Sequence, residues 1–94
     1  DSIVRGNTIK HIIDLLKKYN VGKIIVISSC PEIINENIYG IDIPNKESLI
    51  CYNSDIYKKL DIDFIIFQDL EDLKNSVRYF NNKLNDFEDS IFIK

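Results

Sequence analysis

The chain has 94 residues with a formal net charge of −3, and 45% of its residues are hydrophobic. A chain of this length forms at most one small domain, and its acidic balance argues against binding nucleic acid through a basic face. No apolar run approaches the roughly 18–20 residues of a membrane helix and no secretory signal is visible, so we expect a cytoplasmic protein that binds no membrane.

The first two elements have clear patterns. Apolar residues at three- and four-residue spacing predict an amphipathic helix over residues 8–20, with Lys17 and Lys18 in its last turn. The run KIIVISS, residues 23–29, is rich in β-branched residues and does not alternate. That composition is typical of a strand covered on both faces.

Shorter elements follow a stretch punctuated by Pro and Gly. In chain order we predict a short helix over residues 45–53 capped by Asn45 or the residue beside it, and another over 54–60 capped by Ser54. A buried strand over 61–68, a helix over 69–84 and an edge strand over 90–94 follow. This order is that of an α/β protein with a parallel sheet flanked by helices. Because only two central strands are convincing, we expect that a further strand precedes Asp1 in a longer parent chain.

The opening segment DSIVRGNT carries the clearest chemistry. Gly6 lets a phosphate approach the backbone, Ser2 and Thr8 offer hydroxyl donors, and the open amides of a helix start favour an anion. Asp1 would repel a bare phosphate, so we expect it to accept hydrogen bonds from sugar hydroxyls or to help hold a divalent cation. These residues predict a sugar-phosphate site, and a helix start that binds nothing is the alternative on the pattern alone.

Other reactive side chains favour structural roles. Cys30 and Cys51 are too few for a zinc site or a disulfide framework and are expected as small buried residues. His11 lies within the first helix, where a surface or packing role is favoured over catalysis. The acids Asp69, Glu71 and Asp72 are expected to stabilise a helix N-terminus rather than to bind metal.

Several segments together resemble the amidophosphoribosyltransferase family. DSIVRGNT resembles the phosphoribosyl-pyrophosphate (PRPP) motif of type I phosphoribosyltransferases, which in this family usually reads as two acids followed by SIVRGTT. ISSCPEI, YGIDIPNKESLI, LDIDFIIFQDLEDLKNSV and FEDSIF are similar to later segments of the same family, in the same order. The resemblance therefore extends from residue 1 to about residue 92.

The resemblance implies a role for each residue of the opening loop. Asp1 would contact the ribose hydroxyls of PRPP and help bind its Mg²⁺. The 5′-phosphate would be held, mostly by backbone N–H groups, by residues Ser2, Arg5, Gly6, Asn7 and Thr8. No catalytic residue is implied within the chain.

The family implies a reaction and partners as well. Its members transfer ammonia, released from glutamine in a glutaminase domain, to C1 of the ribose of PRPP and expel pyrophosphate, which makes 5-phosphoribosylamine for purine synthesis. Purine nucleotide inhibitors at the same pocket and a homotetramer are also implied. The chain would be the C-terminal portion of a type I phosphoribosyltransferase domain, with the glutaminase domain absent and no activity of its own.

Two departures from the family pattern matter. Asn7 replaces the first Thr of the motif, a change we expect to be tolerated because backbone amides carry most of the binding. Asn37 stands where some members have a cysteine ligand, so we expect no iron–sulfur cluster. Another type I phosphoribosyltransferase, or a non-catalytic PRPP-binding regulatory module, are the alternative functions.

Overall fold

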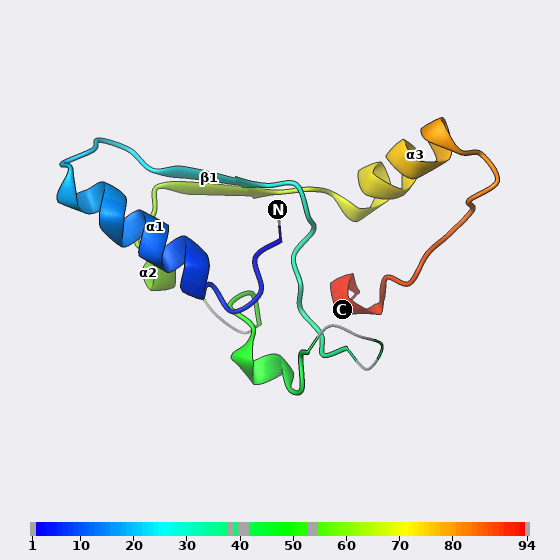
Figure 1. The fold of residues 1–94 in the computed structure, drawn as a ribbon, viewed down its shortest axis with the longest axis horizontal. Helices are drawn as coiled ribbons and strands as arrows, with labels where there is room; N and C mark the ends of the chain where they lie inside the picture. Colours follow the sequence, from blue (N-terminus) through cyan, green and yellow to red (C-terminus); the bar gives the residue numbers. More distant parts are fainter. Residues whose placement is uncertain (1, 38, 40–41, 53–54, 94) are drawn as a thin grey trace.

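The computed structural model describes residues 2–37, 39, 42–52 and 55–93. Its elements, in chain order, are α1 (Asn7–Lys18), β1 (Ile25–Ser28), the 3₁₀ turn η1 (Lys46–Ser48), α2 (Ile56–Leu60), β2 (Phe64–Phe67), α3 (Leu70–Phe80) and the 3₁₀ turn η2 (Ser90–Phe92). Figure 1 shows α1 and α2 beside the paired strands and α3 beyond one end of them. The α/β class predicted from the sequence is confirmed.

The two strands form a parallel pair. Ile25 lies opposite Phe64 and Ser28 opposite Phe67. Just before the strands, the backbone N–H of Asp63 donates to the Ile24 carbonyl at 3.0 Å, and the Asp63 carboxylate accepts from the Ile24 N–H at 2.7 Å. Because these two bonds link the same pair of residues in both directions, they help set the register of the sheet.

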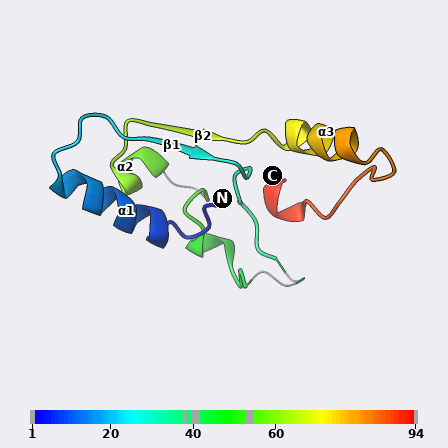
Figure 2. The ribbon, with the colours of Figure 1, turned by 45° about the horizontal axis from the view of Figure 1, so that its top comes forward.

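The main core lies between one face of the sheet and the helices α1 and α2. The tilted view in Figure 2 shows these two helices on one side of the strands. Ile13 of α1 and Leu60 of α2 are both almost completely buried. They pack in one cluster with strand residues from the inner face; its buried members are Ile3, Ile13, Ile24, Val26, Ile50, Leu60, Ile62 and Ile65. Both helices therefore cover the same side of the strands.

The outer face of the sheet is exposed. Ile25, Ile27, Phe64 and Ile66 retain between 46% and 72% of their accessible surface. The expectation that the strands are covered on both faces is therefore wrong for the described chain, because α1 and α2 both pack on the inner face. The apolar run without alternation correctly predicted a strand but wrongly predicted that other elements cover both faces of that strand.

A second, smaller core joins the segment after β1 to the C-terminal segment. Its buried members are Ile33, Ile43, Leu49 and Ile91. The carbonyl of Ile91 accepts from the N–H groups of Ile34 and Asn35, at 2.8 and 3.2 Å. The predicted edge strand over residues 90–94 is wrong, since Ser90–Phe92 form a 3₁₀ turn that buries Ile91, and Lys94 lies outside the described residues.

Helix starts were predicted better than helix lengths. Asn45 caps η1 through its side chain, which accepts from Ser48 N–H, but the helical turn ends at Ser48 instead of extending to residue 53. Asp55 caps α2 by accepting from the N–H groups of Tyr57 and Lys58, and the predicted cap Ser54 lies outside the described residues.

The third helix has the predicted acids at its N-terminus but stands apart from the core. Asp69 accepts from Asp72 N–H at 3.0 Å, and Glu71 and Asp72 occupy the first turn. α3 ends at Phe80 rather than at residue 84, and none of its described side chains is buried. Lys74 forms ion pairs with acids of the C-terminal segment.

No helix within the part of the chain that the structure describes is long and apolar enough to cross a membrane.

The main core predicts a sharp contrast between two neighbouring residues of α1. Ile13 is 1% exposed and Ile12 is 47% exposed. Ile13→Ala should reduce the free energy of unfolding by about 2–5 kcal/mol, because it leaves a cavity in the core. Ile12→Ala should change it by about 0.5 kcal/mol or less. Urea denaturation of the two variants followed by circular dichroism measures the difference, and equal losses would contradict the packing described.

Candidate functional site

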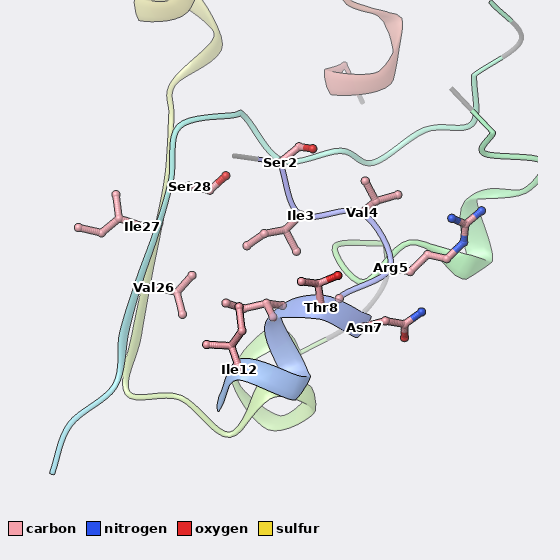
Figure 3. A pocket seen from close by; sticks show the side chains of 12 residues that line it. Ser2, Ile3, Val4, Arg5, Asn7, Thr8, Ile12, Val26, Ile27 and Ser28 are labelled. Carbon is pink, nitrogen blue, oxygen red and sulfur yellow. The ribbon is translucent and has the colours of Figure 1, made fainter. Parts of the chain in front are cut away.

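A cavity of about 530 Å³ separates the opening loop from β1. Residues 2–9 and Ile12 form one side of it and residues 26–28 the other (Figure 3). Ser28 is the last residue of β1, so the lining of the cavity extends to the carboxyl end of a parallel strand. In open α/β sheets this is the usual edge for a ligand.

The loop turns into α1 at Gly6, which has a backbone φ of 83°. A Cβ at this position would lie 2.4 Å from Cδ1 of Ile50. The N–H of Ile50 in turn donates to the Val4 carbonyl at 3.0 Å. The left-handed backbone favours glycine here, and any larger residue would also force the end of the Ile50 side chain to move.

The start of α1 is open to a ligand. No side chain of the described residues caps it, and its first turn holds no acidic residue. The N–H groups of a helix's first turn have no partners within the helix, and they carry the positive end of the helix dipole. An anion in the cavity would find backbone donors that the described side chains leave available.

The predicted site residues that the structure describes all line the cavity, and they differ in the direction of their side chains; they are Ser2, Arg5, Gly6, Asn7 and Thr8. Figure 3 shows the side chains of Arg5 and Asn7 directed away from β1, and Arg5 Nη2 donates to the backbone carbonyl of Asp42 at 2.7 Å. Arg5 and Asn7 can therefore serve this cavity mainly through their backbone.

Asp1 was expected to contact the ribose hydroxyls and to help bind Mg²⁺, and it lies outside the described residues.

Sequence reasoning missed Ser28. This residue is only 3% exposed, and its Oγ donates to the Cys30 carbonyl and accepts from the Cys30 N–H, at 3.1 and 3.2 Å. These bonds stabilise the turn that leaves the strand beside the cavity. Its position at the carboxyl end of a predicted parallel strand was the signal that could have identified it.

The remaining reactive side chains lie elsewhere. His11 is exposed on α1 and does not line the cavity. Burial raises the pKa of the Cys30 thiol, and burial together with the nearby Glu32 raises that of Cys51 to about 11. Both cysteines are therefore protonated and weakly nucleophilic at neutral pH. Among the described residues, no three metal-binding side chains are grouped together.

The contact between Gly6 and Ile50 predicts a coupled pair of substitutions. Gly6→Ala should destabilise the chain by more than the roughly 1–2 kcal/mol expected of a left-handed alanine, since the new Cβ also meets Ile50 Cδ1. Ile50→Val removes that carbon atom, so Gly6→Ala should cost less in the Ile50→Val background. A double-mutant cycle of unfolding free energies measures this coupling.

Gly22→Ala is the matched control, because no atom lies within 4 Å of the added Cβ at that position. It should leave stability nearly unchanged. Equal costs at Gly6 and Gly22, or additive effects of Gly6→Ala and Ile50→Val, would contradict the geometry of the loop.

Comparison with known proteins finds relatives that share one name, although no family model matches the chain. It is 43% identical to an amidophosphoribosyltransferase of Pasteurella multocida, 40% identical to that of Escherichia coli and 36% identical to that of Saccharomyces cerevisiae. Each alignment covers 98% of this chain but only 18–19% of the relative. The chain thus spans about a fifth of the length of these curated relatives, and over that span its sequence is similar to that of amidophosphoribosyltransferases.

Proposed function

We propose that this chain supplies the loop that binds the 5′-phosphate of PRPP in an enzyme that makes 5-phosphoribosylamine from PRPP and glutamine. The relatives' names and the order of the matching segments support this reaction. The observation that carries the proposal is the open start of α1, where Gly6 brings the backbone into the wall of a cavity at the end of β1.

The loop residues would bind the phosphate through two kinds of donor, backbone amides and side-chain hydroxyls. The amides at the start of α1 would bind the phosphate oxygens, and the hydroxyls of Ser2 and Thr8 would donate further hydrogen bonds. Arg5 and Asn7 would contribute through their backbone N–H groups, since their side chains point away from the strand. Holding one end of the sugar in this way orients C1 for attack without chemistry at the loop itself.

Fewer residues of this chain support magnesium binding than support phosphate binding. The described residues lining the cavity include no carboxylate, so they do not form a magnesium site alone. We propose Asp1 as the residue that would help bind Mg²⁺ and the ribose hydroxyls, on the resemblance of the motif only.

Further proposals follow from the family and concern a larger assembly. We propose a glutaminase domain as the source of ammonia, a homotetramer as the assembled form, and purine nucleotides as inhibitors that compete for the same cavity. A cytoplasmic location and the absence of an iron–sulfur cluster complete this proposal. The described residues contain no catalytic group at the cavity, so the chain alone is proposed to be inactive.

A charge placed beside the phosphate separates binding from folding. Thr8→Asp should preserve or raise stability by up to about 1 kcal/mol, because an acid in the first turn favours the helix dipole. It should also weaken binding of ribose 5-phosphate by about tenfold or more, because the carboxylate repels the phosphate. Titrations followed by NMR of backbone amides measure this, with the largest shifts in the wild-type chain expected at Gly6, Asn7 and Thr8.

Thr8→Ser keeps the hydroxyl without adding charge and should bind within a fewfold of the wild-type chain. Undiminished binding by Thr8→Asp would contradict the proposed site.

With PRPP and ammonia the 94-residue chain should release no pyrophosphate, and measurable release would overturn the proposal that it is inactive alone.

A further inference from the structure

A second cavity, of about 300 Å³, lies on the other side of the Gly6–Asn7 turn. It is formed where the first turn of α1 meets η1 and α2, and it does not include the strand residues that line the first cavity. Its polar side chains come from three elements and the loop before them; they are Arg5, Asn7, Lys10, Ser48, Lys58 and Lys59.

The charge of this cavity is opposite to that of the chain. Of its described lining residues, four are cationic and none is acidic, although the whole chain carries a net charge of −3. Arg5 and Lys10 lie on the α1 side, while Lys58 and Lys59 lie on α2. Four like charges around one small space repel each other, so the arrangement is stabilised when an anion enters.

The cations are not neutralised by described acids. The ion pairs of the described residues involve Lys17, Lys74 and Arg78, and none involves a cation of this cavity. Arg5 donates to the Asp42 backbone carbonyl, which orients the guanidinium without cancelling its charge. Two acids flank α2: Asp55 accepts from the N–H groups of Tyr57 and Lys58 as the helix cap, and Asp61 pairs with Lys17.

The size and charge of the cavity indicate the class of ligand. A single phosphate would leave part of the space and most of the positive charge unmatched. A chain of two or three phosphates carries about three to four negative charges and can contact both helices at once. Ser48 and Asn7 add neutral donors between the two pairs of cations.

We propose that this cationic cavity is a second anion site that binds an oligophosphate, separate from the sugar-phosphate loop. The two sites share only the turn at Arg5, Gly6 and Asn7, with side chains of Arg5 and Asn7 serving the second cavity and the backbone serving the first. Ligand bound at one cavity therefore contacts the same turn as ligand bound at the other. This inference does not depend on the reaction proposed above.

Titration with inorganic tripolyphosphate tests the site directly. The variant Lys58→Gln with Lys59→Gln removes two charges from α2 without touching the buried Leu60, and it should weaken binding by about tenfold or more. Lys10→Gln on α1 should weaken it as well, which excludes a purely local effect on α2. Amide shifts in the wild-type chain should include Ser48, Lys58 and Lys59.

The matched control is Lys18→Gln with Lys23→Gln, which makes the same change in net charge at two exposed residues outside both cavities. It should bind tripolyphosphate within about twofold of the wild-type chain, whereas an equal loss in both double variants would mean non-specific attraction and overturn the proposal. Absence of binding, or shifts confined to residues 26–28 and Thr8, would also overturn it.

Two further measurements separate this inference from the proposed function. Binding of ribose 5-phosphate should survive Lys58→Gln with Lys59→Gln, since neither residue lines the first cavity. If ribose 5-phosphate binds to neither the wild-type chain nor the variants while tripolyphosphate still binds, the proposed function is wrong and the second site is retained. A nucleoside triphosphate that binds more tightly than tripolyphosphate would identify a nucleotide as the ligand, and equal affinity would identify the oligophosphate itself.

Discussion

The close packing of Gly6 against Ile50 is the contact on which the functional part of this molecule depends. Ile50 belongs to the main core, and its N–H also binds the Val4 carbonyl two residues before the glycine. The contacts of Ile50 with the loop therefore fix where α1 begins. Because a side chain at position 6 would fill the space that Ile50 occupies, the backbone itself becomes the wall of both cavities.

Positive potential is concentrated around this turn in a chain that is acidic as a whole. On one side are the open amides of α1 and the end of β1, and on the other are four cationic side chains. Acids elsewhere are used differently: Asp55 and Asp69 cap helices, and Asp63 links the starts of the two strands. The distribution of charge thus leaves one region of the described chain suited to phosphorylated ligands.

Local patterns predicted much of the fold, because they depend on neighbours in sequence. Short-range rules account for the spacing of apolar residues in α1, the cap at Asn45, the acids at the start of α3 and the two strands. The C-terminal turn could not be predicted this way. Burial of Ile91 against residues distant in sequence overrides a pattern that, read alone, favours a strand.

The site was predicted in part for the same reason. A glycine before a helix is a local signal, and the structure brings Ser2, Gly6 and Thr8 to one cavity. The outward direction of Arg5 depends on its bond to Asp42, 37 residues along the chain, and the second cavity depends on the meeting of α1 with α2. Such relations between distant segments leave no periodic trace in a single sequence.

The central claim is that the backbone at the start of α1 binds the terminal phosphate of a phosphorylated sugar. A crystal structure of the chain with ribose 5-phosphate tests it most directly. The account predicts a phosphate within hydrogen-bond distance of the N–H groups of the first turn, in the cavity that ends at Ser28. Phosphate density bound only to exposed lysine side chains, with the first turn of α1 contacting solvent alone, would contradict it.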